Sequence, residues 1–118
     1  MEPTIPGLTL LAPLLDAATL RHRVIAHNVA NVNTPGYRRQ TVEFEADLAK
    51  ALATADPHAI RLVKPRVVIA DGPERVDGNT VDIDQEMNSL SKNALIYQAA
   101  AQIIASRIAA LRAAVAGR

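Results

Sequence analysis

The sequence predicts an all-α fold in which long N- and C-terminal helices form an antiparallel, coiled-coil-like hairpin around an irregular middle segment with room for a short β-hairpin. Two observations predict this fold. Apolar residues make up 49% of the chain but aromatic residues only 3%. Aromatic rings usually fill a compact core, so a chain that is rich in small aliphatic side chains and poor in rings is expected to pack long helices closely instead. Apolar residues also recur at spacings of three and four near both ends, which is the pattern of packed helices.

The chain is expected to form one structural domain of three segments, because 118 residues suffice for one small core. Residues 1–37 hold a short lead and a helix, residues 38–80 form a connecting segment, and residues 81–118 form a second helix. Three of the seven prolines lie in the connecting segment and none in residues 81–118. The middle is therefore expected to be partly irregular and the C-terminal helix continuous.

The first helix is expected to span about residues 10–31. Its seam has six apolar residues and one histidine at spacings of four and three: Leu11, Leu15, Ala18, His22, Ile25, Val29 and Val32. Pro13 fits this helix only if it lies in the first turn. The tripeptide at 34–36, Thr-Pro-Gly, ends the helix, because proline blocks continuation and glycine accepts the positive φ of a tight turn.

The connecting segment gives weaker signals. Residues 42–55 have a helical composition, and Asp56-Pro57 ends that helix. Residues 60–63 and 66–69 are expected to form two short strands on either side of a Lys-Pro dipeptide. Asp-Gly-Pro at 71–73 and Asp-Gly-Asn at 77–79 predict turns.

The C-terminal segment gives the strongest signal. Asp82, followed by Gln85 three residues later, is expected to begin the helix as in a capping box. About 33 residues of helix would extend about 50 Å. Nine apolar residues at alternating spacings of three and four, named here the apolar seam, predict a helix with a facing partner: Met87, Leu90, Ala94, Tyr97, Ala101, Ile104, Ile108, Leu111 and Val115. Beside them runs a second stripe of mostly small residues that lets another backbone approach closely: Ile96, Ala99, Ala100, Ile103, Ala110 and Ala114.

Charge and cysteine content exclude several classes of protein. The formal net charge is only +1, which argues against a nucleic-acid-binding protein. The chain has no cysteine, which excludes disulfide scaffolds, thiolate metal sites and thiol nucleophiles. No run of 18 apolar residues occurs, so we expect no membrane-spanning segment. The first residues lack the basic region of a secretory signal peptide, so export would need a route without such a signal.

The sequence shows no pattern of catalytic or metal-binding residues. His22 and His27 are five residues apart and do not form the four-residue pair of a helical metal site. Asp77 and Asn79 resemble the start of a calcium loop, but Val81 stands where a third oxygen ligand is needed. We therefore expect a protein that is not an enzyme and has no metal and no cofactor.

The most distinctive stretch spans residues 26–37 and reads Ala-His-Asn-Val-Ala-Asn-Val-Asn-Thr-Pro-Gly-Tyr. Asn28 and Asn31 lie three residues apart on one stripe of the helix, and amide side chains both donate and accept hydrogen bonds. Two interpretations remain open at this point. One is an ordinary helix C-cap and turn; the other is a contact between chains that sets their register, made by Asn28, Asn31, Thr34, Pro35, Gly36 and Tyr37.

This stretch resembles the signature of bacterial flagellar axial proteins, the rod, hook and hook-associated subunits, which read roughly A-N-N-x-A-N-x-x-T-x-G-[YF]. His27 stands where Asn is common in that signature. Asp-Gly-Asn-Thr-Val-Asp-Ile-Asp-Gln-Glu over 77–86, followed by Asn-Ala-Leu-Ile-Tyr-Gln over 93–98, resembles the proximal rod subunits in particular. The resemblance covers about residues 11–49 and 77–118.

The resemblance implies a structural subunit of the proximal rod of the flagellar basal body, in the periplasmic space and required for flagellum-dependent motility. Subunits of this family are exported by the flagellar type III apparatus without a cleaved signal and polymerise through their terminal helices. The expected partners are other copies of the chain, other rod subunits, the inner-membrane ring, rod-base adaptor proteins and the export apparatus. In the C-terminal helix, the apolar seam supplies the residues expected to take part in assembly: Leu90, Tyr97, Ile104, Ile108 and Leu111.

Two long helices that pair along one stripe bury little apolar area, so we expect the isolated hairpin to be marginally stable and to become rigid on assembly. One alternative from another class remains open. A soluble helical adaptor or export chaperone could bind partner helices through the same seams.

Overall fold

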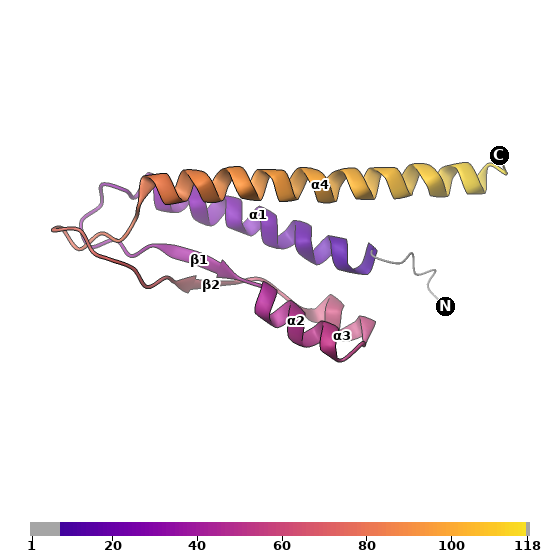
Figure 1. Cartoon of the computed structure of the whole chain (residues 1–118), viewed down its shortest axis with the longest axis horizontal. Helices are drawn as coiled ribbons and strands as arrows, with labels where there is room; N and C mark the ends of the chain where they lie inside the picture. The colour runs from indigo at the N-terminus through magenta and orange to yellow at the C-terminus, as the bar shows by residue number, and fades with distance from the viewer. Residues whose placement is uncertain (1–7, 118) are drawn as a thin grey trace.

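The computed structural model describes residues 8–117 as an elongated molecule with principal extents of 64 × 30 × 14 Å (Figure 1). Its elements, in chain order, are α1 (Leu8–Ala30), β1 (Gln40–Glu43), α2 (Glu45–Ala53), α3 (Pro57–Leu62), β2 (Arg66–Ile69) and α4 (Ile83–Val115).

Helices α1 and α4 lie side by side and antiparallel, and the far end of α4 extends beyond the start of α1 (Figure 1). The predicted pair of terminal helices is therefore confirmed. Helix α4 has 33 residues, as expected, and begins where the capping pattern predicts. One carboxylate oxygen of Asp82 accepts hydrogen bonds from the backbone N–H groups of Asp84 (3.0 Å) and Gln85 (3.4 Å), which satisfies donors that the first turn of a helix leaves free.

The face of α4 that packs within the chain differs from the apolar seam. The buried residues of α4 are Glu86, Asn93 and Ala100, which recur every seven residues. Leu90 and Ile104 of the apolar seam are half-buried beside them. The other large members of the seam are exposed: Met87, Tyr97, Ile108, Leu111 and Val115. The expected heptad spacing is present, but within one chain the contact uses the neighbouring stripe.

Helix α1 begins two residues earlier than expected and ends one residue earlier. Pro13 is its sixth residue, so the expectation that this proline lies in the first turn is wrong. The proline ring is buried, and its packing offsets the one helical hydrogen bond that proline cannot donate.

The middle segment forms a small lobe against α1. Strands β1 and β2 pair antiparallel, with Thr41 opposite Val68 and Val42 opposite Val67. A short β-hairpin was expected, but its first strand was placed wrongly: residues 60–62 belong to α3, and the strand that pairs with β2 is residues 40–43. Asp56 caps α3 and Pro57 is its first residue, a combination that favours a helix start.

The core lies between α1 and this lobe. Phe44 is almost fully buried and packs in one cluster with Ala17, Val24, Val42 and Leu48. Phe44 is the only phenylalanine of the chain, and it joins the end of β1 to the start of α2. The core is therefore built by α1 and the middle lobe, and no residue of α4 belongs to this cluster.

By length and composition alone, helix α4 could cross a membrane. The absence of an unbroken run of 18 apolar residues does not reveal this property. Its apolar stretch nevertheless contains Arg107 and Arg112. Each arginine would cost about 2.5–3.5 kcal/mol near the centre of a bilayer. Contact with other helices accounts for the same alanine-rich surface without that cost.

The core assignment makes a matched prediction with two leucines. Leu48→Ala should lower the free energy of unfolding by about 2–5 kcal/mol, because the truncated side chain leaves a cavity beside Phe44. Leu48 is 8% exposed, whereas Leu62 is 62% exposed. Leu62→Ala should therefore change the free energy of unfolding by less than about 0.5 kcal/mol. Urea unfolding monitored by circular dichroism measures both, and equal losses would contradict the assignment.

Candidate functional site

The two stretches that carry the family resemblance meet at the bend of the hairpin. The turn that follows α1 and the loop before α4 are joined by backbone hydrogen bonds from Gly36 N–H to Asp77 O (2.8 Å) and from Thr80 N–H to Tyr37 O (3.1 Å). Gly36 and Gly78 have φ angles of +74° and +82°, which other residues rarely adopt. The predicted turns at 34–36 and 77–79 are confirmed, whereas residues 71–73 form no turn. The two confirmed turns form one structure, named here the polar bend (residues 26–40 and 75–86).

Asn79 is fully buried and holds the end of α1. Its side-chain NH₂ group lies within hydrogen-bond distance of three backbone carbonyl oxygens, those of Asn31 (2.9 Å), Val32 (3.1 Å) and Thr34 (2.8 Å). Its side-chain oxygen accepts a hydrogen bond from the N–H of Val81 (2.8 Å). These carbonyl groups lie in the turn that follows α1, and they also accept hydrogen bonds from Thr34 N–H, Arg75 and Tyr37 N–H. Asn79 therefore caps this turn from a distant part of the chain.

Asn28 is also fully buried and makes four hydrogen bonds within the chain. Its amide oxygen accepts from the Tyr37 hydroxyl (3.0 Å) and from Gln40 N–H (3.0 Å). Its NH₂ group donates to Gln40 O (2.7 Å) and to Glu86 Oε2 (3.2 Å). The full hydrogen-bonding capacity of the amide is used. Asn28 therefore sets the register of α1, β1 and α4 inside one chain, and its contact with another chain stays a prediction.

Glu86 places a fully buried carboxylate in the same network. Its second oxygen accepts a hydrogen bond from Arg39 Nε in a salt bridge. The backbone N–H of Arg39 in turn donates to the Thr80 hydroxyl (2.7 Å). A buried carboxylate is strongly destabilising without a partner, and here both of its oxygens are hydrogen-bonded. The burial of Glu86 is not visible in the sequence.

Tyr37 lies over this network, and its ring centroid is 5.7 Å from that of His27. The Tyr37 oxygen is 2.7 Å from His27 Nδ1. Because the hydroxyl donates to Asn28, the histidine nitrogen donates in this pair, which requires a proton on Nδ1. Burial, and then the negative charge of Glu86, raise the pKa of Tyr37 above its ordinary value.

Asn31 and Thr34 serve the local turn. The Asn31 side chain donates to His27 O (2.8 Å) and accepts from the Thr34 hydroxyl (3.1 Å). These contacts favour the helix-cap interpretation for Asn31. Asn31 remains half-buried, while Thr34 and Pro35 are exposed at the surface of the bend.

Asn93 is a buried residue that the sequence interpretation did not select. Its NH₂ group donates to Ala18 O (2.7 Å) on α1. Its side-chain oxygen is buried and has no hydrogen-bond partner among the described residues. An Asn at a heptad position inside the α1–α4 contact fixes the alignment of two helices, as polar seam residues do in coiled coils.

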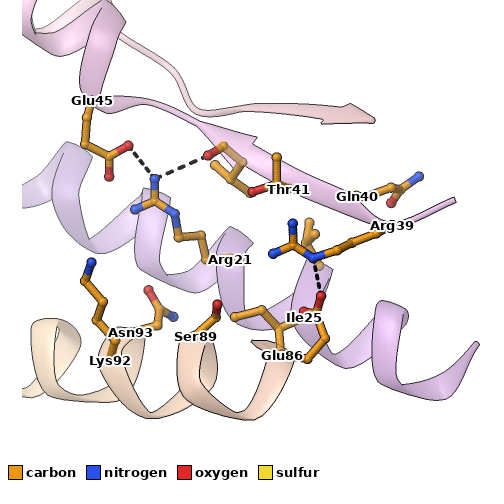
Figure 2. A pocket seen from close by; sticks show the side chains of 12 residues that line it. Arg21, Ile25, Arg39, Gln40, Thr41, Glu45, Glu86, Ser89, Lys92 and Asn93 are labelled. Atoms are coloured by element: carbon orange, nitrogen blue, oxygen red, sulfur yellow. Dashed lines mark hydrogen bonds and ion pairs between the residues drawn. The ribbon is translucent and has the colours of Figure 1, made fainter. Parts of the chain in front are cut away.

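A groove of about 360 Å³ lies between α1, β1 and α4 beside Asn93 (Figure 2). Arg21 crosses it and bonds Glu45 Oε2 (2.5 Å) and the carbonyl of Val42 (3.3 Å). That hydrogen bond from Arg21 is the main reason why the pKa of Glu45 is lowered. The groove holds no nucleophile paired with a base, and within residues 8–117 no three His, Cys, Asp or Glu side chains are placed to hold a metal ion.

The remaining assembly candidates lie on α4. Leu90 and Ile104 are half-buried, and Tyr97, Ile108 and Leu111 are exposed. Other apolar residues of the same half of α4 are also uncovered, because Ile103 and Val115 are 46% and 81% exposed. The chain thus presents two different features: a polar bend that is satisfied internally, and a long apolar helix surface that is not covered.

Comparison with known proteins points to one family. A family model described as "Flagella basal body rod protein" matches residues 15–38. A protein of Borrelia hermsii named flagellar basal body rod protein FlgB is 36% identical over 102 residues, which cover 70% of this chain and 76% of the relative. The proteins of the same name from Escherichia coli K12 and Salmonella typhimurium are 31% and 30% identical over 113 residues, and each match covers 80% of this chain and 81% of the relative.

The role of Asn79 predicts a large effect for a nearly isosteric change. Asn79→Asp replaces the NH₂ donor with a carboxylate that faces three carbonyl oxygens, so it should destabilise the bend by about 3 kcal/mol. Amide hydrogen exchange of residues 31–36 and urea unfolding measure this loss. Asn88→Asp on the exposed surface of α4 is the matched control and should leave both unchanged. Similar effects of the two variants would refute the capping role.

The burial of Tyr37 predicts its titration. In a Tyr97→Phe variant, in which Tyr37 is the one remaining tyrosine, ultraviolet absorbance should give a pKa above the ordinary value of about 10, falling to that value in denaturant. Because the folded pKa is raised, the contribution of neutral Tyr37 to stability is fully present below the unfolded pKa and is lost as pH rises through the folded pKa. An identical pKa in folded and unfolded chains would contradict the buried network.

Proposed function

The chain belongs to the FlgB family of flagellar basal body rod proteins and is a structural subunit of the rod, and we propose that it joins the rod through the uncovered surface of α4. The observation that carries this proposal is the exposure of the apolar seam. Ile108 and Leu111 are 43% and 49% exposed although they stand at heptad positions. An apolar heptad seam on a helix surface is expected to face another helix.

The arrangement of the buried stripe supports this assignment. Within the chain, α4 uses Glu86, Asn93 and Ala100 against α1, so the apolar seam remains for contacts with other subunits. Exposed apolar surface of this extent on a small protein marks an interaction site. The half-buried positions Leu90 and Ile104 lie at the boundary between the two faces, where a neighbouring helix would contact α1 and α4 together.

Folding of the distal half of α4 is coupled to this assembly. The last buried residue of α4 is Ala100, so the part of α4 beyond it must find most of its packing partners outside the chain. An isolated helical segment without tertiary contacts is marginal in water. A subunit that completes its folding only in the rod can be exported in an unfolded form and does not polymerise in the cytoplasm.

The partners proposed for these surfaces are other copies of the chain, other rod subunits, the inner-membrane ring, rod-base adaptor proteins and the export apparatus. The exposed part of the polar bend, Thr34 and Pro35, is a second contact region in this proposal. A soluble adaptor or chaperone role has less support, because family membership accounts for the same uncovered helix surface.

Charge introduced into the apolar seam tests the proposal. Ile104→Asp and Ile108→Asp should abolish rod assembly and motility, because a carboxylate would be desolvated against a neighbouring helix. Gln102→Asp adds the same charge to an exposed polar position on α4 and should be tolerated. Swimming assays and electron microscopy of basal bodies measure assembly, and circular dichroism verifies that the purified variants keep their helix content. Normal motility of both isoleucine variants would refute the proposal.

A further inference from the structure

The two ends of the elongated molecule carry opposite charge. Residues 71–86, named here the acidic tip, contain six acidic residues and one basic residue. Residues 87–118 contain four basic residues and no acidic residue. In Figure 1 the loop that precedes α4 and the C-terminal end of α4 lie at opposite ends of the long axis. The molecule is therefore polar along its length, although its net charge is only +1.

The acidic tip combines charge with a hollow. A depression of about 470 Å³ is bordered by Asp71, Glu74 and Asp82, and Ile83 provides apolar surface in its lining. Arg39 and Arg75 also line it, and they are paired with Glu86 and Asp77. Glu74 is paired with Arg38 (2.8 Å). Asp71, Asp82 and Asp84 have no ion-pair partner in residues 8–117.

The opposite end of the molecule presents the complementary chemistry. Arg107 and Arg112 lie on the distal half of α4 and have no ion-pair partner in the described part of the chain. Exposed apolar residues, Leu111 and Val115, lie beside them on the same helix. Guanidinium groups bind carboxylates with well-defined geometry, and the neighbouring apolar side chains can fill a shallow hollow.

We propose that the end of α4, residues 107–115, of one copy docks on the acidic tip of a second copy of this chain. The proposal rests on the rod-subunit function and adds which surfaces meet. Two tips, or two helix ends, would place like charges together, which disfavours those arrangements. The contact joins different surfaces of two copies, so each added copy leaves a free tip and a free helix end. Such a contact generates an open stack and not a closed dimer.

Charge reversal tests the electrostatic part. Arg107→Glu/Arg112→Glu should weaken self-association of the full chain at least roughly tenfold at low salt. Lys50→Glu/Lys64→Glu makes the same charge change on the exposed surface of the middle lobe and should have little effect. Mixing the arginine variant with an Asp71→Lys/Asp84→Lys variant should restore association. Sedimentation velocity at about 0.05 M and about 0.5 M NaCl gives the affinities, and the wild-type affinity should fall with salt. An unchanged affinity of the arginine variant would overturn the proposal.

Cross-linking tests the geometry, and the absence of natural cysteine makes the result specific. A Gly72→Cys/Val115→Cys variant, treated with a short thiol-specific cross-linker, should give a ladder of oligomers. Each single-cysteine variant alone should give no cross-linked product, and a mixture of the two should give cross-linked dimers only. Dimers from either single variant, or no ladder from the double variant, would overturn the head-to-tail contact.

The Ile104→Asp variant separates this inference from the proposed function. Ile104 lies outside residues 107–115, so it tests the lateral helix contact. If Ile104→Asp abolishes the rod while the ladder fails to form, the end-to-end contact is wrong and assembly through α4 stands. If the ladder forms while Ile104→Asp cells build normal rods, the lateral contact through Ile104 is wrong and the end-to-end contact stands.

Discussion

The hairpin depends on a buried set of polar side chains at its bend. Asn79 caps the turn that follows α1, and Asn28 joins α1 to β1 and to Glu86 on α4. The Glu86–Arg39 salt bridge is supported by Asn28, which donates a hydrogen bond to the second carboxylate oxygen of Glu86. Such a network tolerates one alignment of the helices, since any slip would leave a buried charge or amide without a partner. The bend therefore determines which face of α4 is packed and which face remains available for other subunits.

Much of this architecture could be predicted from the sequence, because local signals and the global fold agree there. The Asp82 cap gave the start of α4 within one residue, and the heptad spacing gave its length. Gly36 and Gly78 stand in turns that need positive φ. The motif resemblance also indicated the right family, because its residues are the ones that form the bend.

Other features could not be predicted from one sequence. The apolar seam has the predicted period, but it is not the face of α4 that packs on α1. Periodicity identifies an apolar face of a helix and does not identify the partner of that face. The stripe that packs on α1 contains Glu86 and Asn93. Because these residues are polar, the sequence pattern does not predict that they are buried. The strand at residues 40–43 has helical neighbours, and only its pairing with β2 makes it a strand. The burial of Asn28 depends on Gln40, Tyr37 and Glu86, and the last of these is 58 residues away along the chain.

The central claim is that one end of the molecule is complete as a single chain and the other end is not. Amide hydrogen exchange of the dilute, full-length monomer tests it most directly. The account predicts strong protection in the bend and in α4 near Glu86 and Asn93, and fast exchange over residues 103–115. Uniform strong protection along the whole of α4, or rapid exchange at the bend, would contradict it.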